Sequence, residues 1–544
     1  MRYKFQLMNS FLLIIFLISI SLLQAETPAA LSAYNVMDFG AMANSKTLDT
    51  DAIQKAIDTC AEAGGGTVYF PAGTYLAGSI RLKSHITLYL DNGAVLLASL
   101  NDNDFDPYEK LHFKNDSDHE TSYFHFSFIW GEDIEHIAIL GQGTIDSNRK
   151  DREGPKTIGL KRCKYVDIKG ITIRNSGNYA ISMLGTDFVN IDGISIFATY
   201  CDGIDPDCCH NVRIANSYIE TWDDAICPKA SFSLGYRRST ENITVSNCII
   251  ATSCNAFKFG TESRGDFKHI TVSNCVFTAY KSKMDYREPT RPISGITLIS
   301  ADGANIEDVN INNIVMDKVR YPFFIRLANR GRDQETPVPG TLKDVTISNI
   351  TISDAYIGGM IIGLPQHPIE NIHFENINLA LEGGEGDEGK YRVYSSLEQP
   401  EKDIEKAMKK YPSANKFNKV PVYGLYLRHV KSLSLENVRL STTETDKRHA
   451  LYFYDADNIV IDNFSAHNIN SDVSQLFFYN VNDAWIRRCR PQTGDEAFLE
   501  ISGKESRKIF LSDNYFDKVK KIFHIKQNAA ENSVQLLNNY GLKK

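Results

Sequence analysis

Three nine-residue segments, YVDIKGITI at 165–173, FVNIDGISI at 188–196 and NVRIANSYI at 211–219, repeat one pattern at a constant interval of 23 residues. Each segment alternates apolar and polar residues, as a β-strand with one buried face does, and turns near a glycine or asparagine. One such unit has too little apolar surface to fold alone, whereas stacked units bury a continuous core. The sequence therefore predicts an all-β protein built as a right-handed parallel β-helix, which is a solenoid.

The pattern extends beyond these three segments, with a constant core and loops of variable length. If Val166, Val189 and Val212 are equivalent, the series continues through Ile243, Ile270, Val309, Val345 and Ile372, at intervals of 31, 27, 39, 36 and 27 residues. A leucine-rich horseshoe would need a regular leucine framework, and a β-propeller would need four strands per blade. Neither pattern is present. We expect asparagine and cysteine at equivalent corners to form internal ladders.

One amphipathic helix precedes the strands. Ile53, Ala56, Ile57 and Cys60 recur at i, i+3, i+4 and i+7, which places them on one helical face. Asp51 followed by Gln54 is a capping-box pattern, and the glycines that follow end the helix. A helix in this place predicts an N-terminal cap over the exposed end of the solenoid.

The first 25 residues have the order of a secretory signal peptide: the basic residues Arg2 and Lys4, an apolar run at 11–23, and a small residue, Ala25. A membrane anchor is the alternative, but the run of 13 residues is shorter than the roughly 20 that a spanning helix needs. We expect an exported protein, periplasmic or secreted, with no membrane association after signal removal. Residues 26–544 would then form a single parallel β-helix catalytic domain.

The composition argues against several partners. The formal net charge is −8 and no run of basic residues is present, so we expect no nucleic acid partner. None of the ten cysteines forms a CxxC pair, which argues against a zinc site, and most of them suit small buried positions. Export would permit a disulfide near Cys208, Cys209 or Cys227. We expect a monomer that needs no cofactor.

Three aspartates lie at matching points of consecutive coils. Asp202 is followed 21 residues later by the adjacent pair Asp223 and Asp224. If each coil has roughly 21–23 residues, these positions are one strand spacing apart, about 4.8 Å, so the carboxylates meet in one patch. Adjacent residues of a straight strand point to opposite faces, so Asp223 and Asp224 reach one site only where the chain bends. Like charges and partial burial raise some of the pKa values there, which lets a general acid and a general base coexist.

Two simpler interpretations of the acidic residues stay open. Asp205 and Asp207 suit the turns of a β-helix without any chemical role. The segment DGIDPD at 202–207 offers alternating carboxylates for a calcium ion, although its spacing is not that of an EF-hand loop.

The segments CDGIDPD at 201–207 and TWDDAICPK at 221–229 resemble the polygalacturonase family of pectin hydrolases, glycoside hydrolase family 28. GGGTVYFPAGTY at 64–75 and GQGTID at 141–146 are similar to that family as well, so the resemblance covers most of residues 34–380. It implies hydrolysis of a glycosidic bond with inversion, with Asp223 as the general acid and with Asp202 and Asp224 activating water. It also implies a pectic substrate, homogalacturonan, rhamnogalacturonan or their oligosaccharides, and no metal.

The chain departs from the family pattern at three places. Tyr200-Cys201-Asp202 stands for Asn-Thr-Asp, Cys254-Asn255-Ala256 stands for Gly-His-Gly, and Thr297 and Ile299 stand at the ends of Arg-x-Lys. An acidic sugar would therefore need other cations. The candidate substrate-binding residues are Lys229, Lys258, Asn255, Glu262 and Arg326. Glu262 either forms an ion pair with Lys258 or binds a sugar.

The largest insertion, 381–423, contains an expected helix at 400–411. Loops on one side of a solenoid shape its binding groove, so this insertion favours a groove closed at one end and cleavage from a chain end. Two rival functions remain. A pectate-lyase-like polysaccharide lyase would need bound calcium and a basic residue, and a non-catalytic carbohydrate-binding β-helix would explain the absent histidine and Arg-x-Lys.

Overall fold

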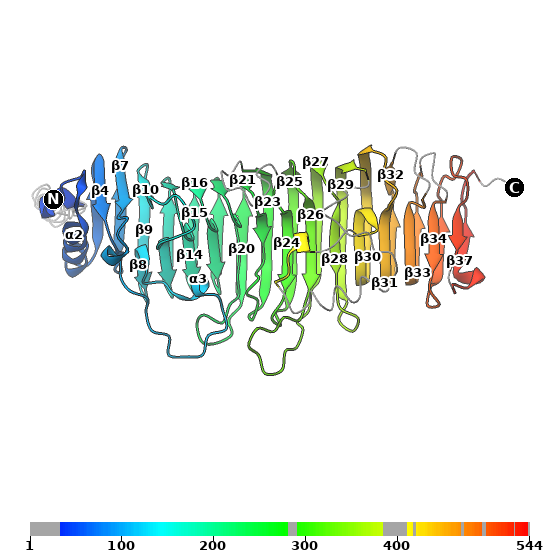
Figure 1. Cartoon of the computed structure of the whole chain (residues 1–544), viewed down its shortest axis with the longest axis horizontal. Coiled ribbons are helices and arrows are strands. Elements are labelled where there is room, and N and C mark those ends of the chain that lie inside the picture. Colours follow the sequence, from blue (N-terminus) through cyan, green and yellow to red (C-terminus); the bar gives the residue numbers. More distant parts are fainter. Residues whose placement is uncertain are drawn as a thin grey trace, which may run out of the picture.

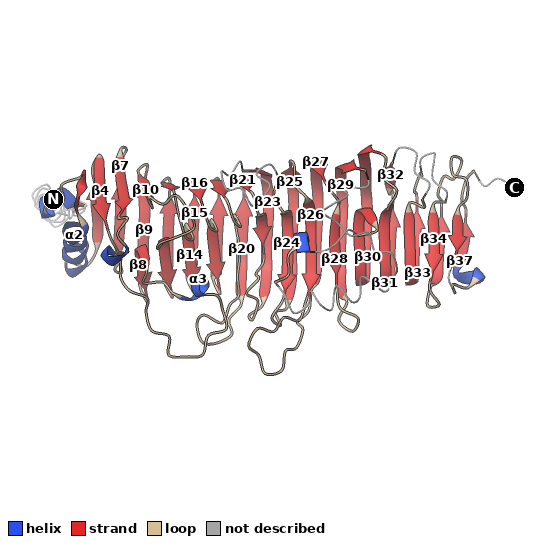
Figure 2. Ribbon diagram, in the orientation of Figure 1, coloured by secondary structure: helices blue, strands red, loops and turns tan. Residues whose placement is uncertain are grey.

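In a computed structural model the chain forms one elongated stack of parallel coils, with the helix α2 (Thr50–Glu62) at one end (Figure 1). The structure describes residues 33–280, 291–384, 411–416, 420–468, 473–491, 497–526 and 528–541. Strands run along the whole stack and the helices are short (Figure 2). The predicted signal peptide and all of the predicted helix at 400–411 except its last residue lie outside the described residues.

Each coil contributes strands to rows that run the length of the stack. The site-bearing row contains β5 (Ile80–Arg81), β8 (Ser127–Glu132), β11 (Lys156–Lys161), β14 (Ile181–Leu184), β17 (Ile204–Asp207), β22 (Asn255–Lys258), β24 (Ser294–Ser300), β26 (Tyr321–Leu327), β28 (Gly359–Ile362), the first part of β30 (Val422–Glu444), the first part of β31 (His449–Asp462), the first part of β33 (Leu476–Arg487), β34 (Leu499–Ser502) and β36 (Phe523–Ile525). The second row contains β1 (Ala33–Asn35), β3 (Gly66–Phe70), β6 (Ile86–Leu90), β9 (Glu135–Gly141), β12 (Lys164–Lys169), β15 (Asp187–Asp192), β18 (His210–Ala215), β20 (Thr240–Ser246), β23 (Phe267–Ala279), β25 (Ile306–Met316), β27 (Lys343–Ala355), β29 (Ile369–Gly383), β35 (Arg507–Ser512) and β37 (Val534–Leu537), together with the later parts of β30, β31 and β33. The third row contains β2 (Asn44–Leu48), β4 (Gly73–Ala77), β7 (Ala94–Ala98), β10 (Thr144–Asp146), β13 (Thr172–Arg174), β16 (Ser195–Thr199), β19 (Tyr218–Thr221), β21 (Ile249–Thr252) and β32 (Ser465–His467), with the ends of the long strands.

The register of the second row confirms the equivalences expected from the sequence. Val166 pairs with Val189, Val189 with Val212, and the same row continues through Ile243, Ile270, Val309, Val345 and Ile372. All of these side chains are buried in one apolar core that runs through the stack. The repeat is therefore a packing repeat, because each coil contributes one apolar side chain to the same buried line.

Helix α2 covers the first coils, as expected, and buries Ile53, Ala56, Ile57 and Cys60. The predicted capping box is wrong. The helix begins one residue earlier than Asp51, and Gln54 hydrogen-bonds to Asp58 and to the backbone of Arg81. The preceding Asp49 does not cap the helix either, because its carboxylate accepts the N–H groups of residues 42 and 43 at 2.7 and 3.0 Å.

Asparagines occupy repeated corners between the second and third rows. Asn216 and Asn247 have φ of 54° and 56°, and the amide of Asn247 donates to the side-chain oxygen of Asn216 at 3.2 Å. Asparagine tolerates this left-handed backbone better than most residues do. The expected asparagine ladder is confirmed, but it lies on the exposed side of the corner. All ten cysteines are buried and free of disulfides.

Long loops leave the stack on one side, where α3 (His119–Ser122) also lies (Figure 1). The remaining short helices are η1 (Val36–Phe39), η2 (Asp102–Asp104), η3 (Ala414–Lys416) and η4 (Glu531–Ser533). Among the helices that the structure describes, none has the length and apolar character that a membrane crossing requires.

The buried line of apolar residues predicts a sharp contrast between neighbouring positions of β20. Ile243 is fully buried and Thr244 is exposed. We expect Ile243→Ala to destabilise the fold by about 2–5 kcal/mol, since it leaves a cavity in the core, and Thr244→Ala to change stability by about 0.5 kcal/mol or less. Urea denaturation of both variants measures this difference. Equal midpoints for the two variants would contradict the packing repeat.

Candidate active site

Three consecutive coils place polar side chains at the start of the site-bearing row. Ile204, Ile226 and Phe257 are bridged in register, and the residues two positions before them are Asp202, Asp224 and Asn255. The coil step is therefore 22 residues here (204 to 226), so Asp202 aligns with Asp224 rather than with Asp223. These residues line a cleft of about 440 Å³, a size usual for ligand sites.

The chain bends between β19 and the bridge at Ile226, as the adjacent acidic pair required. The hydroxyls of Thr221 and Thr252 donate to the backbone carbonyl of Asp223 at 2.7 and 2.6 Å. The backbone N–H of Asp224 donates to the Asp223 carboxylate at 3.1 Å. These contacts hold the bend, and both acidic side chains reach the cleft.

Two buried lysines hold two of the acids. Lys229 Nζ donates to Asp202 Oδ2 at 2.9 Å and also to Asp205, and it lies 4.5 Å from the centre of the Tyr179 ring. Lys258 Nζ donates to Asp224 Oδ2 at 2.5 Å. The side chains of both lysines are only 3–4% exposed, so these ion pairs are shielded from water.

Two uncharged groups complete the surroundings of Asp224. Asn255 Nδ2 donates to Asp224 Oδ1 at 2.5 Å, and Lys258 also donates to the hydroxyl of Tyr411 at 2.9 Å. Asn255 therefore fixes the Asp224 carboxylate without adding a titratable group.

Burial dominates the protonation of these groups. Burial raises the pKa of Asp202. The nearby carboxylates of Asp223 and Asp224 raise this pKa further, whereas the ammonium group of Lys229 lowers it. Burial likewise raises the pKa of Asp205 well above its usual range, since one ammonium group serves both carboxylates. Burial lowers the pKa of Lys229, but the attraction of Asp202 and Asp205 prevails and holds it above the usual range.

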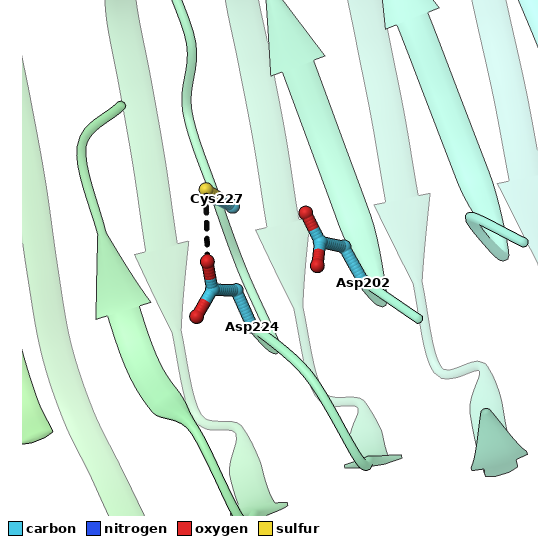
Figure 3. A group of neighbouring side chains, drawn as sticks. All are labelled: Asp202, Asp224 and Cys227. Carbon is cyan, nitrogen blue, oxygen red and sulfur yellow. Dashed lines mark hydrogen bonds between the residues drawn. The ribbon is translucent and has the colours of Figure 1, made fainter. Parts of the chain in front are cut away.

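Figure 3 shows Asp202 and Asp224 on neighbouring coils, with the thiol of Cys227 3.9 Å from an oxygen of Asp224. Carboxylate and thiol atoms of these three residues lie within 4.8 Å of one another, as do those of Asp223, Asp224 and Cys254. Neither group fits a calcium ion, which takes six to eight oxygen ligands. Neither suits a thiolate-bound metal, because burial raises the pKa of Cys227 and the two lysines already bind the carboxylates.

The cleft contains residues that the sequence analysis did not identify. Arg152 donates to Asp223 Oδ2 at 2.6 Å from a loop between β10 and β11. Glu120 lies beside it, and Tyr179 and Tyr411 also line the cleft. Only the charged run RKDREG at 149–154 could have indicated Arg152, and it carries no motif.

Glu262 lines the cleft but does not pair with Lys258, which is bound to Asp224. Its nearest cation is Arg332, at 3.5 Å. Burial and the neighbouring Asp118 raise the pKa of Glu262 to about 7. The ion-pair alternative is therefore wrong, and a sugar-binding role for Glu262 stays a prediction.

Arg326 is not brought to the cleft. It lies on β26 with 1% of its surface exposed, and it pairs in register with Ile299 and Ile362. Both isoleucines belong to a second apolar cluster on the outer face of the sheet. A substrate-binding role for Arg326 stays a prediction that this cleft does not support, because alternation along a strand gives the face on which a side chain lies but not what covers that face.

Family models match two parts of the chain. The model described as "Glycosyl hydrolases family 28" matches residues 110–392, and "Rhamnogalacturonase A/epimerase, pectate lyase-like" matches residues 33–118. The first match spans more than half of the chain and includes every aspartate and lysine that lines the cleft.

Individual relatives point the same way. A "Probable polygalacturonase" of Vitis vinifera is 24% identical over 421 residues, which cover 70% of this chain and 83% of the relative. The structure of a hyperthermoactive exopolygalacturonase from Thermotoga maritima matches with a TM-score of 0.55 and 21% identity, over 64% of this chain and 87% of that chain. A family 28 exopolygalacturonase from Yersinia enterocolitica matches with a TM-score of 0.54 and 19% identity, over 80% of this chain and 78% of that chain. The expected fold class, an all-β right-handed parallel β-helix, is confirmed.

Removal of the Lys229 ammonium group, which Asp202 and Asp205 share, should change the pH dependence of activity. In Lys229→Met, Asp202 loses the cation that favours its ionised form, so we expect its pKa to rise and the acidic limb of the pH–activity profile to move to higher pH by about one unit or more. Two buried carboxylates without a partner should also cost about 3–5 kcal/mol of stability.

The sign of the stability effect is testable. A carboxyl whose pKa is higher in the folded than in the unfolded state loses stability as the pH rises above its unfolded pKa, so Lys229→Met should be closest to wild type near pH 4 and furthest from it near pH 7. Lys169→Met, which removes an exposed ion pair with Asp167, is the matched control. A pH profile and thermal stability like those of the control would contradict the role of Lys229.

Proposed function

The chain belongs to glycosyl hydrolases family 28 and is a glycosidase, and from this premise we propose that it hydrolyses galacturonosyl bonds in pectin or its oligosaccharides with inversion. The observation that carries the proposal is the convergence of Asp202, Asp223 and Asp224 on one cleft of a β-helix. The relatives named above as polygalacturonases support the pectic substrate.

Asp202 and Asp224 suit the role of a shared base. A carboxylate oxygen of each lies within 4.8 Å of the other, which is close enough for one water molecule to hydrogen-bond to both. Lys229 and Lys258 each occupy one oxygen of these carboxylates and fix their orientation. In this proposal the water attacks C1 of the sugar and gives its proton to this pair.

Asp223 then serves as the general acid. It approaches the cleft from the bend, and its side chain is more exposed, at 13%, than those of Asp202 and Asp224, at 7% and 5%. Its proton goes to the glycosidic oxygen as the bond from C1 to that oxygen breaks. The leaving sugar departs with a new hydroxyl, and the water oxygen enters on the opposite face of C1.

We further propose that cleavage proceeds from a chain end. Tyr411, Ser413 and Asn415 line the cleft on one side, and Asp118 and Glu120 line it from the loop that precedes β8. Segments from the insertion 381–423 and from the stretch before β8 thus confine the cleft. Two structural neighbours are titled exopolygalacturonases, which supports the same mode of action.

Product analysis tests the assignment. We expect wild type to release saturated products with new reducing ends from polygalacturonate, and Asp223→Asn, Asp202→Asn and Asp224→Asn to lower kcat by about 10²–10⁴-fold each, because each removes a proton-transfer or water-positioning group. Asp167→Asn, an exposed aspartate on β12, is the control and should keep full activity. Unsaturated products, or full activity in Asp223→Asn, would contradict the proposal.

The protein is also proposed to be exported, on the order of basic, apolar and small residues at 1–25. Expression of the full chain in a secreting bacterial host should give a mature protein that begins at Glu26, as N-terminal sequencing would show. Leu17→Arg interrupts the apolar run and should block processing. Unprocessed wild-type chain retained in the cytoplasm would contradict export.

A further inference from the structure

Arg152 connects the acidic pair with a loop from an earlier coil. Its Nη1 donates to Asp223 Oδ2 at 2.6 Å. Its opposite edge, Nε and Nη2, donates to one oxygen of Glu120 at 3.4 and 3.2 Å. One guanidinium group therefore touches the acid of the proposed reaction and, on its other edge, a second carboxylate.

The two lysines of the cleft are already occupied by protein carboxylates. Lys229 serves Asp202 and Asp205, and Lys258 serves Asp224, with side chains that are 4% and 3% exposed. Arg152 is the third cation among the described residues that line the cleft, and its side chain is 33% exposed. An anionic sugar that enters the cleft can reach Arg152 without breaking a buried ion pair.

The contact of Arg152 with Glu120 is the one that a ligand can replace. It is long, it uses a single carboxylate oxygen, and the Glu120 side chain is 37% exposed. Exposed ion pairs of this kind contribute little stability. The Nε–Nη2 edge of an arginine is also the edge that binds a carboxylate through two parallel hydrogen bonds. Glu120 thus occupies a carboxylate-binding position with suboptimal geometry.

The place of this position relative to Asp223 indicates which sugar it serves. Asp223 protonates the oxygen that the leaving sugar keeps. In a 4-linked uronide that oxygen is on C4, and the carboxylate is attached to the adjacent C5, so the two groups lie within a few bonds of each other. A neutral leaving sugar, such as a deoxyhexose, has no carboxylate there.

We propose that Arg152 binds the carboxylate of the leaving sugar, and that Glu120 holds this position until the substrate displaces it. This inference rests on the proposed function and makes it more specific: the substrate is a 4-linked galacturonan, with an acidic sugar on the leaving side, and not a chain with a neutral sugar there. Arg152 supplies the charge that the Thr297 and Ile299 positions lack.

Kinetics on two forms of one substrate test the proposal. We expect Arg152→Gln to lower kcat/KM on the free-acid galacturonate trimer by about 10–100-fold, and on its methyl ester by less than about 3-fold, since the ester offers no charge to bind. Glu120→Gln removes the competing carboxylate and should lower KM for the free acid severalfold. Arg152→Lys keeps the positive charge but cannot form two parallel hydrogen bonds to a carboxylate. Its kcat/KM on the free acid should therefore lie between those of Arg152→Gln and wild type.

Arg264→Gln is the matched control, because Arg264 forms an ion pair at 2.9 Å with Asp116, which lies just before helix α3, the helix that contains Glu120. It should leave the preference for the free acid unchanged. Equal losses of Arg152→Gln on both substrates, no loss on either, or the same selective loss in Arg264→Gln would each overturn the proposal.

Binding measurements separate this inference from the proposed function. Asp224→Asn keeps Arg152 and Glu120, so calorimetric titration with the free-acid trimer needs no turnover. If wild type hydrolyses neither galacturonan nor the trimer, the proposed function fails. The carboxylate site would still be supported if Asp224→Asn binds the trimer and the double variant that also carries Arg152→Gln does not. Absence of trimer binding by Asp224→Asn, with wild type still active on galacturonan, would overturn the carboxylate site and leave the proposed function standing.

Discussion

In-register stacking of apolar side chains is the constraint on which the whole active site depends. A strand that slipped by one residue would turn its buried side chains outward, so each coil is held in one register by the core. Asp202 and Asp224 lie two residues before the buried Ile204 and Ile226, which are bridged. The distance between the two carboxylates is thus set by core packing and not by contacts between the acids themselves, which repel each other.

Charge balance is the second condition of the site. Burying several carboxylates together is unfavourable unless cations accompany them. Lys229 and Lys258 each lie on the coil that follows the acid they bind, and their ammonium groups bind Asp202 and Asp224. Two uncharged side chains complete the Lys258–Asp224 pair: Asn255 donates to Asp224, and Tyr411 accepts from Lys258. Arg152, on the rim, is the more exposed cation and is suited to a ligand, whereas the lysines are suited to orienting the acids.

Residues within the repeat could be predicted from the sequence, and residues on loops could not. The equivalence of Val166 with its partners follows from a fixed period, and so does the meeting of Asp202 with Asp224. Arg152 reaches the cleft from a loop and Glu120 from the short helix α3, and the path of both segments depends on tertiary contacts that no local pattern encodes. The burial of Arg326 could not be predicted for a related reason, because the apolar cluster over its strand is built from distant segments.

The configuration of the first product tests the central claim most directly. A separation of 4.8 Å or less between Asp202 and Asp224 suits a pair that shares one water, with Asp223 as a separate acid. If that account is right, proton NMR spectra taken early in the hydrolysis of an α-linked galacturonate oligomer will show the β-anomer first. Initial release of the α-anomer would mean a covalent intermediate on one of these aspartates, and would contradict the roles of all three.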